Sequence, residues 1–391
     1  MKADSQFKIA STSQFCRIAC AGILILCLFL FSRLWNLEQF PVVSDEAMYI
    51  NLSQIVAEDF SDRALFRKEG KHPLFMWFTA ISLQGIDDPL LAGRVVSVLS
   101  GIASLFAIFL VGRMLYSERI AWVACWIYLF CPFTFFFDRL ALVESLLCAT
   151  ALWTAWVALK LARGEWQDPR AYFILGILAG LSFFTKAGAL LFFPVILFIF
   201  ALWKMPKRSD LMRSLSGAIL GAGLWIIPLM LFGKEIGFFS RTALMQLPQI
   251  FMAPRELATF PWQHWGNNFL AMTGFYISYL TLPLCLVLFL GTVTAIRNKK
   301  REDLTLMFWA FFPPVVILLF TKGFYSRYLL LFVPPLILLS ARGCVELGEF
   351  LSRRWQSQPA KNFWSTGAIA LVLITMLSDG FFLPGNGSTI H

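Results

Sequence analysis

Two adjacent carboxylates, Asp45 and Glu46, follow the first long apolar stretch of the sequence, in the segment SDEAMYI that begins at Ser44. Carboxylates can accept a proton as a general base or bind a divalent cation, so both residues are candidates for chemistry. The structural alternative is a capped helix lying on the membrane surface. In that interpretation Ser44 is the N-cap, and both carboxylates complement the helix dipole in the first turn.

A second group of charges lies in the segment FFFDRLALVESLLCAT, which contains Asp138, Arg139 and Glu144. Glu144 is expected about one and a half turns into an otherwise apolar helix, where a carboxylate is unfavourable and usually marks a functional site. The alternative is a buried ion pair between Glu144 and Arg139 that only holds helices together. Asp138 fits equally well as a solvated residue at a helix start.

Cations that could hold a phosphate occur in two further segments, GKHPLFMW and TKGFYSRYLLLFVPPL. The first contains Lys71 and His72, and the second contains Arg327 and Tyr328. Lys and Arg side chains bind phosphate groups, so these residues are candidate anion ligands. The alternatives are a lysine at the lipid headgroups, an exposed histidine and an arginine that snorkels to lipid phosphate. Lys186 in FFTKAGAL is weaker evidence of the same kind.

The composition requires that these residues be positioned by membrane-spanning helices. Of 391 residues, 58% are hydrophobic and only 14% are charged, and apolar runs near 20 residues recur along the chain. These features predict an all-α polytopic membrane protein, with residues 1–391 forming one domain. We expect eleven spans, near 17–35, 90–112, 120–137, 140–161, 171–184, 187–203, 214–232, 269–296, 304–321, 324–341 and 363–383.

The distribution of positive charge predicts the orientation. With the N-terminus in the cytoplasm, most of the 33 Lys and Arg residues fall in cytoplasmic segments, as the positive-inside rule requires. Two long loops, 36–89 and 233–268, then lie outside, and the short apolar segment 72–84 is an interfacial helix in the first of them. The candidate site therefore faces outward from the cell membrane. The net charge of +10 is spread over several short loops, which argues against nucleic-acid binding.

The second outer loop contains the aromatic segment FPWQHWGNNF. Trp262, His264 and Trp265 could form a lid that contacts a sugar or an acceptor. Aromatic residues are equally common at membrane interfaces, so a simple interfacial belt is the alternative.

The order of these motifs along the chain resembles the GT-C superfamily of integral-membrane glycosyltransferases. The segments that carry the resemblance are SDEAMYI, GKHPLFMWF and DRLALVESLL, all within the first 150 residues, and SRYLLLFVPPL near the end of the chain. The nearest branch is the group of protein O-mannosyltransferases and aminoarabinose transferases. The resemblance implies a sugar donor linked to polyprenyl phosphate.

The resemblance also implies roles for individual residues. Asp45 matches the catalytic base, and Glu46 would assist it. The positions that match the family's contacts to the donor phosphate are Lys71, Arg327 and Tyr328. Arg139 is a further candidate phosphate ligand because of its charge and its place on the same face. Glu144 matches a second acidic position that is usually Asp, and with Asp45 and Glu46 it could hold Mg²⁺ or Mn²⁺.

These roles predict an inverting transfer. Asp45 would take the proton of an acceptor hydroxyl on a glycolipid, polysaccharide or protein, while cations stabilise the leaving lipid phosphate. One alternative is a transporter or flippase for lipid-linked glycans, which would need ionisable groups near the bilayer midplane. Another is an outer-face glycan polymerase or ligase.

Overall fold

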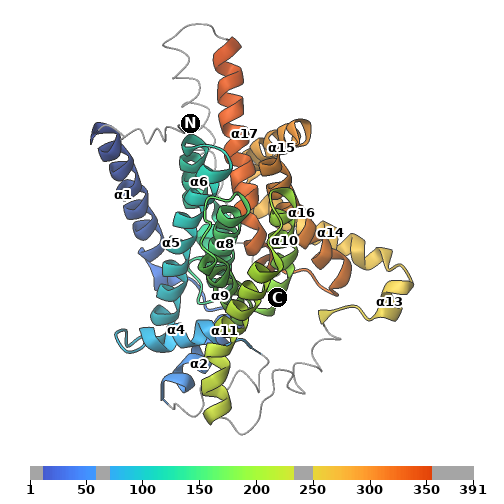
Figure 1. Cartoon of the computed structure of the whole chain (residues 1–391). Coiled ribbons are helices and arrows are strands. Elements are labelled where there is room, and N and C mark those ends of the chain that lie inside the picture. The colour runs from blue at the N-terminus through green and yellow to red at the C-terminus, as the bar shows by residue number, and fades with distance from the viewer. Residues whose placement is uncertain (1–11, 59–70, 233–249, 355–391) are drawn as a thin grey trace.

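The structure is a computed structural model that describes residues 12–58, 71–232 and 250–354. All regular elements in these ranges are helices, and a single antiparallel bridge joins Phe251 and Thr321 (Figure 1). This agrees with the all-α class predicted from the composition.

A central layer of long helices is formed by α5 (Pro89–Leu115), α6 (Glu118–Phe130), α8 (Val143–Ala162) and α17 (Val333–Arg354). Helix α5 packs against α6 and α8, and α17 packs against α6 and against α15 (Leu282–Asn298). Helix α1 (Thr12–Leu34) flanks this layer and contacts α5 and α6. The contacts bury small and aliphatic side chains, which allows close packing of helices that are apolar all around.

A second group of helices covers the other side of α8. It consists of α9 (Arg170–Thr185), α10 (Phe193–Leu202), α11 (Arg208–Phe232) and α16 (Arg301–Phe320). Helices α9 and α11 touch backbone to backbone, because a Cβ atom on Gly176 would lie only 1.9 Å from the carbonyl oxygen of Ser214. Larger side chains at this crossing would force the two helices apart.

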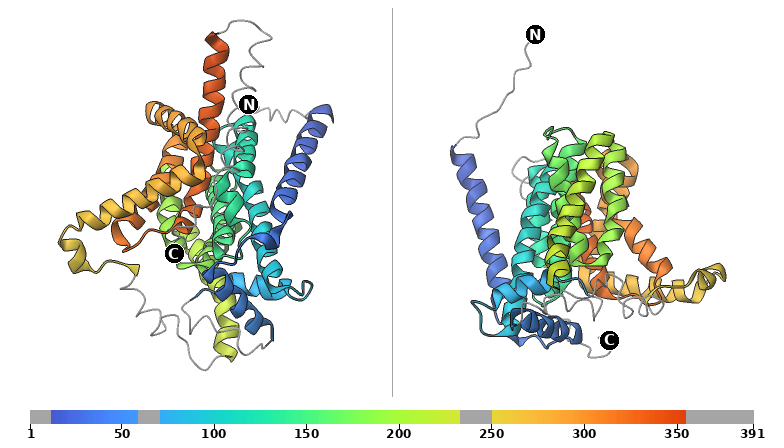
Figure 2. Two further views of the ribbon diagram at one scale, coloured as in Figure 1. Left: turned by 180° about the vertical axis from the view of Figure 1, so that it is seen from behind. Right: turned by 60° about the horizontal axis from the view of Figure 1, so that its bottom comes forward.

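The short elements and helix α14 (Trp262–Leu280) gather at one end of the bundle. The short elements are η1 (Leu37–Gln39), α2 (Ser44–Glu58), α4 (Leu74–Ser82), α7 (Pro132–Phe137), η3 (Ala187–Phe192), α13 (Pro254–Ala258) and η4 (Ser326–Phe332). In the right-hand view of Figure 2, α2, α4 and the α13–α14 segment lie beyond the same end of the long helices. With nine residues, α4 is about 14 Å long and too short to cross a bilayer, as predicted for 72–84.

The opposite end of the bundle contains basic loops. Arg163, just after α8, donates to the carbonyl oxygen of Met114 near the end of α5. Arg119 at the start of α6 lies 3.9 Å from Glu349 near the end of α17, so ends of these four helices lie close together. The basic residues Arg119 and Arg163 and the short helices therefore lie at opposite ends of the helix bundle. With many large apolar side chains exposed on the outside of the bundle, among them Leu99 and Phe106, the chain is an integral membrane protein.

Four helical segments of the described chain are long and apolar enough to cross a membrane, namely α5, α8, α16 and the continuous Ser326–Arg353. Three predicted spans have a different form. The 120–137 segment breaks into α6 and α7 at Cys131, and 269–296 bends by 109° between α14 and α15. The 324–341 span begins in η4 and continues in α17 as far as Arg354. The 363–383 span lies outside the described residues, and the count of eleven stays a prediction.

Candidate functional site

The candidate base, Asp45, lies in the first turn of α2. Ser44 is the first residue of this helix and not its N-cap as predicted, because the first helical hydrogen bond runs from the backbone N–H of Ala47 to the carbonyl oxygen of Val43. The Asp45 carboxylate forms an ion pair with Arg327 of η4, 282 positions later in the chain. The Asp45 side chain is 24% exposed and that of Arg327 is 30% exposed, so both remain open to a ligand from the water side. The structure thus joins two motifs that the sequence shows only as separate segments.

A second ion pair lies beside the first. Glu144, in the first turn of α8, accepts a hydrogen bond of 2.5 Å from Nζ of Lys186, at the junction of α9 and η3. The alternative interpretation, in which Glu144 pairs with Arg139, is therefore not what the structure shows. Nζ of Lys186 also lies 5.3 Å from the ring centroid of Tyr328, while the guanidinium of Arg327 lies 5.8 Å from the same ring. The Tyr328 ring therefore contacts both cations.

The loop before α4 completes the cluster. Nζ of Lys71 lies 5.7 Å from the ring centroid of Tyr49 in α2, and the His72 ring packs edge-on against Phe183 at 5.3 Å. Burial raises the pKa of Tyr49, and the nearby Glu144 and Tyr328 raise it further. These contacts bring Lys71, His72 and Tyr49 into the same region as the two ion pairs. We call the group Asp45, Tyr49, Lys71, His72, Glu144, Lys186, Arg327 and Tyr328 the charged cluster.

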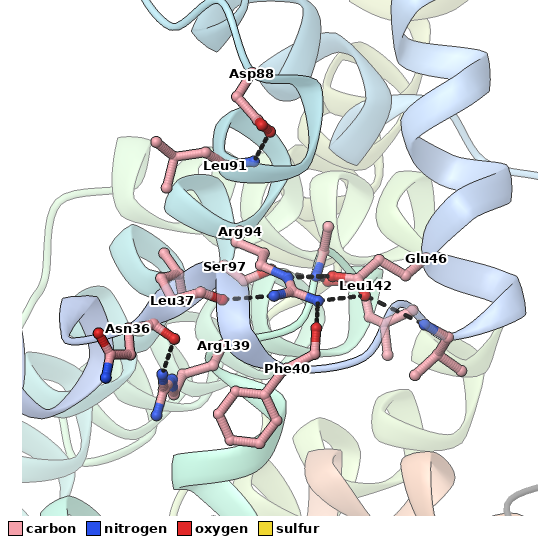
Figure 3. Close-up of polar contacts among 12 residues, drawn as sticks. Asn36, Leu37, Phe40, Glu46, Asp88, Leu91, Arg94, Ser97, Arg139 and Leu142 are labelled. Carbon is pink, nitrogen blue, oxygen red and sulfur yellow. Dashed lines mark hydrogen bonds and ion pairs between the residues drawn. The ribbon is translucent and has the colours of Figure 1, made fainter.

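Glu46, the predicted catalytic helper, has a different environment from its neighbour. Its carboxylate is fully buried and forms a two-point ion pair with Arg94 of α5, at 2.8 and 2.9 Å (Figure 3). The backbone N–H of Ala141 also donates to it at 2.8 Å. Arg94 in turn donates to the carbonyl oxygens of Leu37 and Phe40. Glu46 therefore fastens the α1–α2 and α7–α8 loops to α5, and we assign it to the scaffold.

Arg139, a predicted phosphate ligand, also belongs to the scaffold. It is 5% exposed and donates to the carbonyl oxygens of Trp35 and Asn36, at 2.6 and 2.9 Å (Figure 3). Its guanidinium stacks over the rings of Phe40 and Phe135. These contacts hold the end of α1, and they leave Arg139 badly placed to receive a phosphate.

Asp138, described above as a solvated helix-start residue, is fully buried. Its carboxylate accepts hydrogen bonds from the hydroxyls of Tyr128 and Ser145, at 3.1 and 2.9 Å. Asp138 therefore links α6 to the start of α8 and stabilises the loop that precedes Glu144.

Comparisons with known proteins identify a matching family and similar relatives. The family described as dolichyl-phosphate-mannose-protein mannosyltransferase matches residues 70–232. An undecaprenyl phosphate-α-4-amino-4-deoxy-L-arabinose arabinosyl transferase of Aeromonas hydrophila is 24% identical over 384 residues, or 92% of the chain. The chain spans 65% of the length of that relative.

Solved structures share the architecture. ArnT from Cupriavidus metallidurans, bound to undecaprenyl phosphate, superposes with a TM-score of 0.64 at 16% identity, covering 94% of this chain and 71% of ArnT. The oligosaccharyltransferase AglB from Archaeoglobus fulgidus, in complex with an inhibitory peptide and a dolichol-phosphate, gives a TM-score of 0.59 at 12% identity. It covers 96% of this chain and 56% of AglB. The chain has the GT-C fold.

Within this GT-C fold, the segment formed by α13 and α14, which we call the arm, is attached to the end of α16, a few residues before Arg327 of the charged cluster. Nε1 of Trp265 donates to the carbonyl oxygen of Leu319, and the side-chain amide of Asn268 donates to those of Leu318 and Thr321. Trp265 is therefore an anchor of α14 on α16. The part of this loop at 233–249 lies outside the described residues.

The exposed surface of α14 has two distinct faces. At about 100° per residue, one sector carries large exposed apolar side chains, and the adjacent sector carries exposed polar ones. The apolar side chains are Trp262, Phe269, Leu270 and Ile277. The polar ones are Gln263, His264, Asn267 and Ser278. A helix with this pattern, bent by 109° from the following span, favours the interfacial interpretation of Trp262 over a lid.

The three carboxylates predicted to hold a metal are not arranged as one site. Among the described residues no three His, Cys, Asp or Glu side chains are grouped as a metal ion would need. Asp45 pairs with Arg327, Glu46 with Arg94 and Glu144 with Lys186. Because each carboxylate already has a cationic side chain as its partner, we derive no step through a metal.

From the sequence, Lys186 was only weak evidence for the site, and neither Tyr49 nor Arg94 was a candidate. Arg94 lies near the start of the apolar helix α5 and is fully buried, and a guanidinium buried there requires a carboxylate partner. The need for a carboxylate partner near Arg94 could therefore have indicated the Glu46–Arg94 pair from the sequence alone. No comparable signal exists for Tyr49, because an aromatic residue on an interfacial helix is common.

The buried position of His72 leads to a pH-dependent stability. Burial and the positive charge of Lys186 lower the pKa of His72 from 6.5 to about 4. Below pH 6.5 the unfolded chain takes up a proton that the folded protein does not, so the free energy of unfolding should decrease as the pH falls from 6.5 towards 4. Thermal unfolding in detergent between pH 7.5 and 5 measures this slope. His72→Gln should flatten it, whereas His264→Gln, at an exposed position of α14, should retain the wild-type slope; equal slopes in all three proteins would contradict the assignment.

Proposed function

We propose that the protein is an inverting glycosyltransferase that moves a sugar from a polyprenyl-phosphate donor to an acceptor hydroxyl. The observation that carries this proposal is the direct pairing of Asp45 with Arg327 at the open end of a GT-C fold. A base and a phosphate ligand must both come within reach of the same reacting carbon, and here they come from two distant segments that the fold brings together. The similarity to an undecaprenyl phosphate-α-4-amino-4-deoxy-L-arabinose arabinosyl transferase and to ArnT bound to undecaprenyl phosphate supports this class of donor.

The reaction follows from the residues of the charged cluster. Asp45 accepts the proton of the acceptor hydroxyl as its oxygen attacks the anomeric carbon. The bond from that carbon to the phosphate oxygen breaks, and its electron pair stays on the phosphate. Arg327, together with Lys71, stabilises the charge that develops there. The attack is in line with the leaving group, so the anomeric configuration inverts, and Asp45 later returns its proton to water.

The leaving group explains why one base suffices. A lipid phosphate is already a stable anion, so it needs a cation rather than a proton donor. His72 is therefore not required as a general acid, and its lowered pKa of about 4 keeps it neutral near pH 7.

The location of the site is part of the proposal. The charged cluster lies at the end of the bundle opposite the basic loops near Arg119 and Arg163. The positive-inside rule assigns those loops to the cytoplasm and hence the site to the outer face of the cell membrane. The acceptor would then be a glycolipid, a polysaccharide or a protein that reaches this face.

The test is a transfer assay with the purified protein in liposomes. Undecaprenyl-phosphate sugars would be supplied as donors with extracted membrane lipids as acceptors, and the products would be analysed by mass spectrometry. Release of undecaprenyl phosphate together with a new glycosidic bond is expected. Movement of the donor across the bilayer without bond formation would instead identify a transporter.

A further inference from the structure

Both cations that touch the Tyr328 ring have a carboxylate partner. Arg327 pairs with Asp45, and Lys186 pairs with Glu144. The charges within each pair cancel, so Arg327 and Lys186 are already neutralised before a phosphate arrives. Cationic phosphate ligands that are neutralised before their ligand arrives require an explanation.

We propose that the two ion pairs are the resting form of the phosphate site, and that a lipid phosphate exchanges with Asp45 and Glu144 as the partner of Arg327 and Lys186. This inference rests on the proposed function and extends it in two respects. It makes Lys186 a phosphate ligand, which its pairing with Glu144 conceals. It also makes the release of Asp45 from Arg327 depend on the phosphate, so that the base becomes available only when the donor is bound.

The contact between Asp45 and Arg327 leaves too little space for the reacting groups. During transfer, the acceptor oxygen and the anomeric carbon must lie between Asp45 and the phosphate that Arg327 holds. In the structure Asp45 and Arg327 are in direct contact, which leaves no room for either atom. Productive binding must therefore separate the pair, and a new anion next to Arg327 is the group that can replace the carboxylate.

Both ion pairs are of a kind that separates easily. The Asp45 and Arg327 side chains are both partly exposed, and ion pairs in such positions are weak. Glu144 is 4% exposed, but it holds Lys186 through one oxygen, and its Oε2 has no hydrogen-bond partner among the described residues. The Glu46–Arg94 pair, which we assigned to the scaffold, differs from these two in its burial and in its number of hydrogen bonds. Glu46 and Arg94 are completely buried and joined by two hydrogen bonds, so they are built to stay together.

The experiment measures binding of undecaprenyl phosphate to the purified full-length protein in detergent, with neutral undecaprenol as the reference. Asp45→Asn removes the competing charge and keeps the shape of the side chain. If the carboxylate competes with the phosphate, this variant should bind undecaprenyl phosphate about tenfold more tightly than wild type. Glu256→Gln is the matched control, because Glu256 pairs with Lys322 at 2.8 Å on the surface of the arm, and its affinity should stay at the wild-type value.

The second pair supplies an independent set of variants. Glu144→Gln should also tighten binding, whereas Lys186→Met should weaken it about tenfold and Lys186→Arg should restore it. Equal or weaker binding by both Asp45→Asn and Glu144→Gln would overturn the exchange, as would unchanged binding by Lys186→Met. A wild-type protein that does not distinguish undecaprenyl phosphate from undecaprenol would instead contradict the proposed function.

Discussion

Replacing Asp45 with asparagine is expected to lower kcat for sugar transfer by about 10²- to 10⁴-fold, the usual contribution of a general base. The amide has the same shape as the carboxylate but cannot take the proton of the acceptor hydroxyl. Folding should be nearly unaffected, because the Asp45–Arg327 pair is partly exposed and such pairs contribute about 0–1 kcal/mol. Initial rates with an undecaprenyl-phosphate sugar, together with thermal unfolding in the same detergent, measure both quantities.

The combined changes in kcat and in KM for the donor of Asp45→Asn are more informative than the loss of kcat alone. If the phosphate and Asp45 compete for Arg327, the KM for the donor should fall while kcat collapses, when chemistry limits turnover. A defect in folding would lower the amount of active protein without lowering KM. Near-normal turnover by well-folded Asp45→Asn would remove Asp45 from the reaction, and Glu256→Gln should retain wild-type rates throughout.

The sequence predicted that Asp45 and Arg327 lie on the same side of the membrane, for a physical reason. Apolar runs of bilayer length fix the number of crossings between two polar segments, and the positive charges then fix on which side each segment emerges. This argument brings both residues to the same end of the bundle without any knowledge of packing. It is coarse, however, because it places residues on a face and cannot say which side chains touch.

The adjacent residues Asp45 and Glu46 show that limit. Consecutive positions on a helix point about 100° apart, so one can face the open site while the next faces the bundle. Which one does so depends on the rotation of α2, and this is set by its packing on α4 and α5. Arg139 and Glu144 show the same limit: they are close in sequence, yet Glu144 pairs with Lys186 and Arg139 binds the loop after α1.

Proline positions help to explain why the predicted spans 120–137 and 269–296 are broken or bent in the structure. The break between α6 and α7 falls at Pro132, and the bend between α14 and α15 falls just before Pro283, because proline readily occupies a first helical turn. Yet Pro313 and Pro314 lie inside α16, which continues through them. Proline therefore marks where a break is permitted, and tertiary packing decides whether it occurs.

The largest effect on stability is expected from the buried pair of Glu46 and Arg94. Glu46→Gln leaves the Arg94 guanidinium buried without a counter-charge, and breaking such a pair typically destabilises a protein by about 3–5 kcal/mol. The loops around Leu37 and Ala141 should loosen as well, because Arg94 and Glu46 hold their backbone groups. Thermal unfolding in detergent measures the loss. The adjacent Asp45→Asn is the matched control, since the same chemical change at an exposed pair should have little effect.

A double-variant cycle separates this scaffold role from a catalytic one. Glu46→Gln combined with Arg94→Met removes both charges, so the double variant should recover part of the stability lost by Glu46→Gln alone. If Glu46 acts only through folding, the protein that remains folded should turn over at a rate that tracks stability, and the double variant should regain activity with it. A Glu46→Gln protein that unfolds like wild type but fails to transfer sugar would instead establish Glu46 as the helper of Asp45 that the resemblance implied.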